Sequence, residues 1–180
     1  DGQLALVIDP GDLVIDTTIS ITEEVGNTPE VDLVSGGDPG LGQAIAIALA
    51  QAGAHIAAVG RSAPTETEAA VRAAGRAFHW VEAALDTPAP VAAVVAAVEA
   101  KLGPIDIIVL NATCDQPHKP IEEYDWAFFQ SMVDFFIKSP FLLTRACLPA
   151  MYERHWGRVV NVASVAGRIG IKYGSAYAAA

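Results

Sequence analysis

The sequence is poor in cysteine, in positive charge and in aromatic residues. It has two cysteines, Cys114 and Cys147, which are too few for a disulfide framework or a cysteine-based metal cluster. Eleven lysines and arginines stand against 21 aspartates and glutamates, which gives a formal net charge of −10. Because an acidic surface repels phosphate backbones, the composition argues against a nucleic-acid partner. Two reduced thiols are typical of a cytoplasmic protein.

Long hydrophobic runs are also missing. Glycine, proline or charged residues interrupt every apolar stretch before the roughly 20 residues that a membrane span needs, so we expect no membrane partner. The opening DGQLALVID has no basic region before its apolar run, and we therefore expect no signal peptide there. What the chain has instead is 52% hydrophobic residues, with many small alanines and valines. Such residues suit helices that lie close to both faces of a buried sheet.

Strand-like and helix-like segments alternate from residue 31 onward. Glycine and proline separate them, and the helix-like segments place apolar residues three or four apart. We expect strands at 31–35, 55–60, 76–82, 105–110 and 158–164, the last two buried, and helices at 41–52, 65–74, 91–102 and 122–154. This alternation predicts an α/β, doubly wound parallel sheet of the Rossmann-like type with three αβα layers over 31–180. Ligands of such sheets bind beyond the carboxyl ends of the strands.

The first polar loop, SGGDPGLG at 35–42, lies between an expected strand and an expected helix. Its glycines allow a tight turn and a close backbone approach to a pyrophosphate. The start of the following helix offers free N–H groups and the positive end of the helix dipole to that anion. The candidate cofactor-binding residues here are Ser35, Gly36, Asp38, Gly40, Leu41 and Gly42.

The ends of two further strands carry candidate cofactor residues. No acidic residue lies between Gln51 and Thr65, where an NAD enzyme usually places one for the ribose. Arg61 lies there instead and could pair with a 2′-phosphate, which favours NADP over NAD, although the acidic Asp38 in the glycine loop favours NAD. Asn111 and Ala112 follow the strand at 105–110, where the asparagine could brace the sheet end beside the cofactor.

Two hydroxyl side chains are the candidate catalytic residues. Ser164 ends the expected strand at 158–164, and Tyr177 follows 13 residues later, after a glycine-rich stretch. That stretch lets the chain double back, so both hydroxyls could face one pocket.

Together, SGGDPGLG, the Asn111-Ala112 pair, NVASVAG and the spacing from Ser164 to Tyr177 resemble the short-chain dehydrogenase/reductase family over 31–180. The stretch GLGQAIAIALAQAGAHIAAVGRSAPTETEAAVRAAGR is similar to the branch that contains 2-deoxy-D-gluconate 3-dehydrogenases. The resemblance implies an NAD(P)-dependent oxidoreductase that interconverts a secondary alcohol and a ketone, such as a sugar or sugar acid, without a metal. Tyr177 would act as general acid/base and contact the cofactor, and Ser164 would bond the substrate oxygen. It also implies a homotetramer.

Several positions depart from the family pattern. The family's lysine, four residues after the tyrosine, would fall just beyond Ala180, and the C-terminal elements are expected to be missing too. Phe136 stands in place of an asparagine, Ala84 in place of an aspartate and Thr113 in place of a glycine. These departures leave open an alternative: a non-catalytic subunit of the same fold that binds a partner and can bind a nucleotide.

Residues 1–30 lie outside the alternating pattern and are expected to form an N-terminal extension. Two alternating runs flank Pro10 and Gly11, which suit the turn of a β-hairpin. Alternatively, residues 1–11 resemble the last core strand of the family and could form an extra strand.

Overall fold

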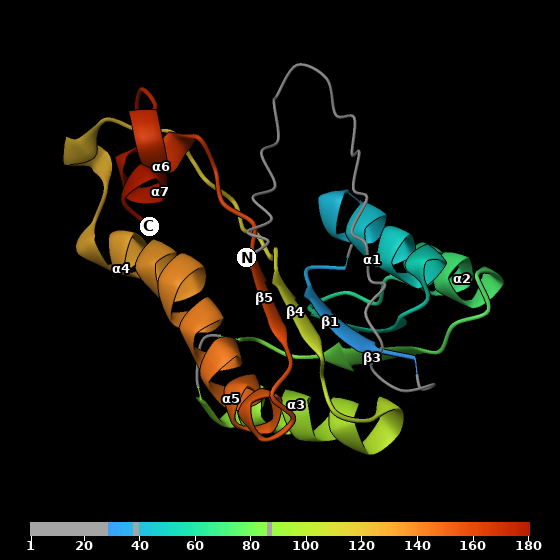
Figure 1. The fold of residues 1–180 in the computed structure, drawn as a ribbon. Helices are drawn as coiled ribbons and strands as arrows, with labels where there is room; N and C mark the ends of the chain where they lie inside the picture. The colour runs from blue at the N-terminus through green and yellow to red at the C-terminus, as the bar shows by residue number, and fades with distance from the viewer. Residues whose placement is uncertain (1–28, 38–39, 86–87) are drawn as a thin grey trace.

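A computed structural model describes residues 29–37, 40–85 and 88–180 of the chain (Figure 1). The predicted hairpin or extra strand within residues 1–30 lies almost wholly outside the described residues. Asp38 of the glycine loop is also outside them. The described strands form one parallel sheet in the order β3-β2-β1-β4-β5. Their bounds are β1 Val31–Ser35, β2 His55–Gly60, β3 Phe78–Glu82, β4 Ile107–Leu110 and β5 Arg158–Asn161.

Helices cover both faces of this sheet, which confirms the doubly wound, three-layer prediction. Figure 1 shows α1 and α2 on one side and α3 and α5 on the other. The helices are α1 Leu41–Ala52, α2 Thr65–Ala73, α3 Pro88–Leu102, α4 Trp126–Val133, α5 Ser139–Glu153, α6 Ala166–Ile169 and α7 Ser175–Ala179, with a 3-10 turn at Ile121–Glu123 and a π-helical segment, η2, at Asp134–Lys138.

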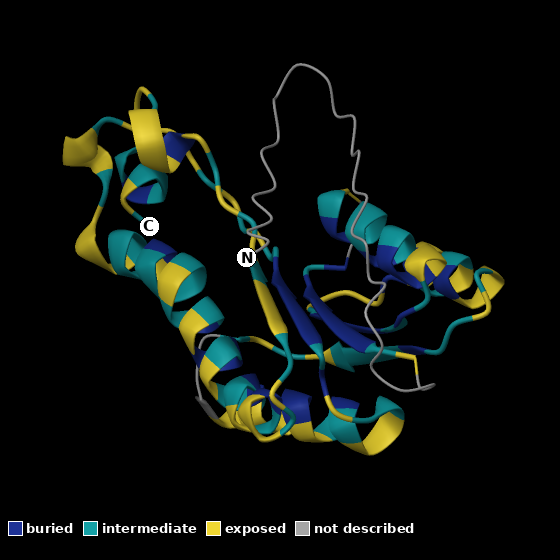
Figure 2. Cartoon of the chain, viewed as in Figure 1, coloured by how far each residue is buried: buried dark blue, intermediate teal, exposed yellow. Residues whose placement is uncertain are grey.

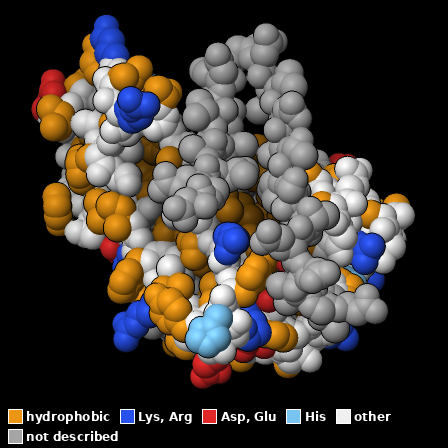
Figure 3. Space-filling view, viewed as in Figure 1, with side chains coloured by type: hydrophobic (Ala, Val, Ile, Leu, Met, Phe, Trp, Pro, Cys, Tyr) orange, Lys and Arg blue, Asp and Glu red, His pale blue; other side chains and the backbone are white. Residues whose placement is uncertain are grey.

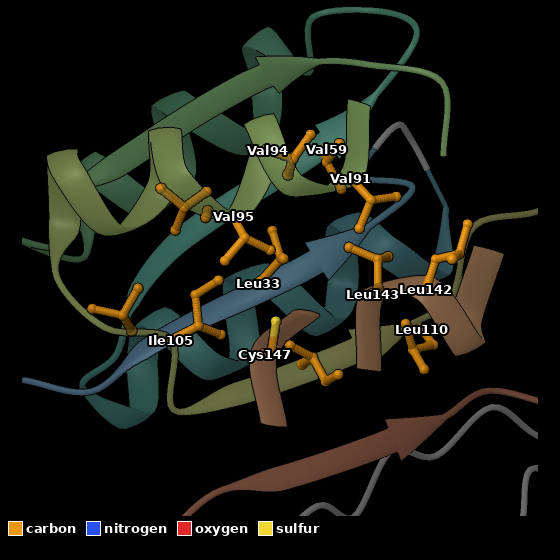
Figure 4. Packing of buried hydrophobic residues seen from close by; sticks show 14 of the residues in the cluster. Leu33, Val59, Val91, Val94, Val95, Ile105, Leu110, Leu142, Leu143 and Cys147 are labelled. Atoms are coloured by element: carbon orange, nitrogen blue, oxygen red, sulfur yellow. The ribbon is translucent and has the colours of Figure 1, made fainter. Parts of the chain in front are cut away.

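The core has two halves because successive strand residues point to opposite faces. In β1, Leu33 packs among side chains of α3 and α5, which Figure 4 shows pointing toward one another. The next residue, Val34, packs against α1 and α2. Each such buried aliphatic side chain contributes roughly 1.5–3 kcal/mol. On β2, Ala57 and Ala58 are both fully buried, as the expectation of close helix-on-sheet packing requires.

Strand β5 differs from its prediction. It ends at Asn161 rather than Ser164, and most of it is exposed instead of buried (Figure 2). The physical reason is its place in the described sheet: β5 pairs with β4 on one side and forms the edge. An apolar sequence run predicts a strand but does not show whether both of its faces are covered.

The expected helix at 122–154 is divided into pieces. Asp125 caps α4 by accepting a 2.7 Å bond from the Phe128 N–H. The helix then widens to π-type bonding in η2, where the Ser139 N–H donates to the Asp134 carbonyl. This widening directly precedes Pro140, which has no N–H to continue the regular ladder.

A carboxyl group lies inside the core, at Asp32 of β1. Its side chain is fully buried, and neither oxygen has a hydrogen-bond partner among the described residues. Burial raises the pKa of Asp32 well above its usual range, and the negative charges of Glu30 and Asp106 raise it further. The folded state therefore favours the neutral carboxylic acid. The strand predicted at 31–35 is present, but the apolar run that predicted it does not show that the Asp32 carboxyl is buried.

Candidate active site

The glycine loop leaves β1 in a conformation that only small residues allow. Gly36 has a φ of +71°, and its N–H donates a 2.9 Å bond to the Val59 carbonyl. A Cβ on Gly36 would lie 2.8 Å from the Ala112 Cα. A Cβ on Gly42 would overlap the Gly36 carbonyl oxygen and lie 2.7 Å from the Asn111 Nδ2. Two glycines of the motif are therefore needed for the loop to pack against the end of β4.

The N-terminus of α1 has no side-chain cap from Gly40. Gly40, with a φ of +130°, precedes Leu41 and provides no side-chain cap. A Cβ on Gly40 would meet no described atom within 4 Å. The first N–H groups of the 12-residue α1 therefore lie, without a side-chain cap, at the positive end of its dipole. A helix start of this kind, preceded by a glycine turn, suits the pyrophosphate of a dinucleotide.

Hydrogen bonds join the ends of β1 and β4. The buried Ser35 Oγ donates to the Val109 carbonyl at 3.2 Å and accepts from the N–H groups of Asn111 and Ala112 at 2.9 and 3.1 Å. The Asn111 Nδ2 donates to the Ser35 and Gly36 carbonyls, both at 3.2 Å. Asn111 therefore braces the sheet end beside the glycine loop, as its position predicted.

Thr67 supports the same loop and was missed in the sequence. It is fully buried on α2, and its Oγ1 donates a 2.9 Å bond to the Gly37 carbonyl. The available signal was its spacing: Thr67 and Val71 lie four apart and form the buried stripe of α2. A threonine in an apolar stripe needs a partner for its hydroxyl, and here that partner is the glycine loop.

Arg61 lies exposed directly after β2, near the segment that follows β4. Burial raises the pKa of Cys114, and the nearby positive charge of Arg61 opposes this rise. The guanidinium forms no ion pair with another described residue. Its position at the carboxyl end of β2 makes it available to an anionic ligand. Asp38, the acidic residue that favours NAD over NADP, lies outside the described residues.

The two predicted catalytic residues lie on segments that pack together. Ser164 follows β5, and its Oγ accepts a 3.2 Å bond from the Ala166 N–H at the start of α6. Tyr177 lies on the short helix α7. The predicted glycine-rich loop between them includes α6, which lies beside α7 (Figure 1). The structure thus brings the two segments together, and a shared pocket for both hydroxyls stays a prediction.

Phe136 contacts the proposed acid/base directly. Its ring centroid lies 5.2 Å from that of Tyr177 at an interplanar angle of 63°, an edge-to-face pair. Phe135 packs edge-on against Phe136 in turn, with centroids 5.1 Å apart. At this position the chain therefore places an apolar ring beside Tyr177 where the family pattern has an amide. The other two departures lie on the surface, at the exposed Ala84 and Thr113.

Metal sites and membrane-spanning helices can be assessed for the described residues. Within 29–37, 40–85 and 88–180, no group of three or more histidine, cysteine, aspartate or glutamate side chains could hold a metal ion. No helix in the same ranges is long and apolar enough to cross a bilayer.

A doubly wound parallel sheet with a glycine turn before α1 is a dinucleotide-binding architecture. The family model described as short chain dehydrogenase matches residues 30–180. A 2-dehydro-3-deoxy-D-gluconate 5-dehydrogenase of Formosa agariphila is 33% identical over 84% of this chain and 58% of its own length. The chain belongs to the short-chain dehydrogenase family, and this relative supports the predicted sugar-acid branch.

Solved structures agree with this assignment. An NAD+-bound xylitol dehydrogenase matches with a TM-score of 0.80 and 28% identity over 84% of this chain and 59% of its own. A metagenomic short-chain oxidoreductase in complex with NADP matches with a TM-score of 0.79 and 30% identity, over 84% of this chain and 70% of its own. The chain thus spans little more than half of its curated relative, and the relatives' names include both nicotinamide cofactors.

Proposed function

We propose that the protein is an NAD(P)-dependent oxidoreductase that interconverts a secondary alcohol and a ketone. The observation that carries this proposal is the glycine turn before α1, where Gly36 and Gly42 let the loop pack against the end of β4 and Gly40 leaves the helix start without a side-chain cap. It lies at the carboxyl end of the sheet, where the segments bearing Ser164 and Tyr177 also begin. A bound nicotinamide supplies or accepts the hydride in this chemistry.

The chain's own residues divide the remaining work. Ser35, Leu41, Asn111 and Ala112 shape the cofactor cradle by backbone contacts and hydrogen bonds. Tyr177 exchanges a proton with the substrate oxygen, and Ser164 holds that oxygen by a hydrogen bond. A tyrosine with a pKa of about 10 is a weak base at neutral pH. The proposal therefore requires a cation near Tyr177 that favours the phenolate.

NADP is the favoured cofactor, and Arg61 is the reason. Guanidinium groups recognise phosphates through charge-assisted hydrogen bonds. Changing Arg61 to Gln should weaken NADPH binding about tenfold or more and leave NADH binding within twofold, because one charge-assisted bond is worth about 1.5–3 kcal/mol. Titration with both cofactors measures this difference, and an equal loss for both would assign Arg61 a structural role instead.

The substrate class, assembly and compartment follow from other features. The sugar-acid relative favours a sugar or sugar acid as substrate.

Trp126 and Phe141 on α4 and α5 are 72% and 58% exposed, and Figure 3 shows hydrophobic side chains on this part of the surface. Such an apolar surface favours a homo-oligomer, proposed as a tetramer, which gel filtration tests. The free Cys114 and Cys147 fit a reducing, cytoplasmic compartment.

The test is turnover by the intact protein. Nicotinamide absorbance is followed with NADPH and NADH across a panel of sugar acids, hydroxy acids and simple ketones. A substrate-dependent change is the expected result. Tight cofactor binding without turnover across the whole panel would contradict catalysis and favour the second candidate, a non-catalytic subunit. The observation that favours a non-catalytic subunit is the contact of the apolar Phe136 ring with Tyr177.

A further inference from the structure

A single phenol oxygen joins two loops beside α7. The Tyr124 hydroxyl lies 2.6 Å from the Pro117 carbonyl and 2.9 Å from the Tyr173 carbonyl. It also accepts a 3.2 Å bond from the Lys119 N–H, which in turn lies 2.7 Å from the Tyr173 carbonyl. The loop after β4 and the turn before α7 therefore meet at one side chain.

The ring of Tyr124 is fixed to α4. It stacks on Phe128 with centroids 5.3 Å apart and an interplanar angle of 5°. The neighbouring Asp125 caps α4 through the Phe128 N–H. The stacking contact and the cap thus place the Tyr124 ring at the start of α4. The Tyr124 hydroxyl thus contacts both the loop after β4 and the turn before α7 from the start of α4.

The turn that Tyr124 holds has an unusual backbone. Tyr173 has a φ of +61°, a left-handed conformation that residues other than glycine rarely adopt. The turn closes with the Gly174 N–H donating to the Ile171 carbonyl at 3.1 Å. Helix α7 begins at the next residue and carries Tyr177 in its first turn. A strained residue of this kind persists only when its surroundings over-determine it, and the bonds to its carbonyl do so here.

We propose that Tyr124 is a positioning residue for Tyr177. Its hydroxyl fixes the turn at 171–174 against α4, and this turn sets where α7 presents the Tyr177 ring. The inference rests on the proposed function for its catalytic consequence, while the hold on the turn stands on the contacts alone. Among the described residues, Tyr124 bonds to the loop after β4 and to the turn before α7, and stacks on Phe128, so its effect on Tyr177 is indirect.

The test compares Tyr124→Phe with Tyr152→Phe in the intact protein. The first change removes only the hydroxyl and keeps the ring that stacks on Phe128. The second removes a hydroxyl from Tyr152, an exposed tyrosine of α5. That hydroxyl makes no hydrogen bond with a described residue. Amide hydrogen exchange in 171–180 should become about two- to tenfold faster in Tyr124→Phe, the change expected for loss of one hydrogen bond. Exchange in β1 and α1 should stay unchanged in both.

Steady-state kinetics supply the second measurement. In Tyr124→Phe, kcat should fall about three- to tenfold, while KM for the nicotinamide cofactor and the pH midpoint of the rate stay as in wild type. Faster exchange over the whole chain, or an unchanged rate in 171–180, would overturn the positioning role. Absence of turnover in the wild type would refute the proposed function instead, and the exchange comparison would still decide whether Tyr124 holds the turn.

Discussion

Strands β4 and β5 are neighbours in the sheet, yet they differ in burial and in the hydrogen bonds made by the residues that follow their carboxyl ends. All of β4 is buried, and the residues after it share a network of bonds with Ser35 and the glycine loop. Most of β5 is exposed, and the Ser164 side chain beyond it makes one hydrogen bond with a described residue, in the next helix. The cofactor half is therefore part of the core, and the proposed catalytic half depends on side chains of α4 and η2.

This contrast separates stability from catalysis. Substitutions in the glycine loop and its braces should cost folding free energy as well as cofactor affinity. Substitutions around Ser164 and Tyr177 should cost turnover and leave folding nearly unchanged. Matched pairs of substitutions, one in each half, can test whether the contrast is real.

The largest difference is expected between two glycine-to-alanine changes. Alanine at Gly42 would overlap the Gly36 carbonyl, so Gly42→Ala should lower the free energy of unfolding by about 1–3 kcal/mol and weaken nicotinamide binding. Gly167, on α6, has open space at its Cβ position. There the same change should be neutral or stabilising by up to about 1 kcal/mol. Thermal unfolding of both variants measures this, and equal effects would remove the contrast.

Two serines give the next comparison. Ser35→Ala leaves the N–H groups of Asn111 and Ala112 without their acceptor, at a cost of about 1–3 kcal/mol. Ser164→Ala loses one bond at a less buried position and should cost below about 1 kcal/mol. Its turnover should nevertheless fall on the order of 10²-fold, as for loss of a donor to a reacting oxygen. A larger loss of stability at Ser164 than at Ser35 would reverse the account.

Asp32 predicts an unusual pH dependence of stability. Its folded pKa is raised, first by burial and then by Glu30 and Asp106, so the folded state binds a proton that the unfolded state releases. Stability from this group is therefore fully present below the unfolded pKa of about 3.9 and is lost as pH rises toward the folded value.

Replacing Asp32 with Asn removes that titration. Asp32→Asn should match wild type near pH 4 and be more stable than wild type at pH 8, because wild type must then either bury the charged carboxylate or protonate it. Denaturant unfolding at both pH values measures the difference. The control Asp115→Asn, at an exposed position, should change neither value. An unaltered pH slope in Asp32→Asn would show that the carboxyl is paired in solution.

The smallest effect is expected at a surface ion pair of the cofactor half. Arg72 and Glu68 lie 2.8 Å apart on α2, with side chains 56% and 41% exposed. Glu68→Gln should cost about 0.3–0.5 kcal/mol, and added salt should reduce that loss further. A cost above that of Ser35→Ala would mean that surface charge, rather than the buried network, stabilises this half.

The sequence predicted most of the sheet because parallel strands and their glycine turns have strong local patterns. Gly36 and Asn111 could be placed because each directly follows a buried strand, and Gly42 because it lies at the start of the helix after the glycine turn. Three features could not be predicted: the exposure of β5, the unpaired carboxyl of Asp32 and the bond from Thr67 to the glycine loop. Each depends on contacts between segments far apart in the chain, which hydrophobic periodicity does not report. The contact of Phe136 with Tyr177 arises in the same way.

The central claim is that Tyr177 transfers the proton in a nicotinamide-dependent reaction. The most direct measurement is turnover of Tyr177→Phe beside wild type, at saturating cofactor and with cofactor affinity measured on the same samples. We expect kcat to fall about 10²- to 10⁴-fold, with folding and cofactor binding retained. Undiminished turnover in Tyr177→Phe would contradict it, because the phenol could then have no part in the chemistry.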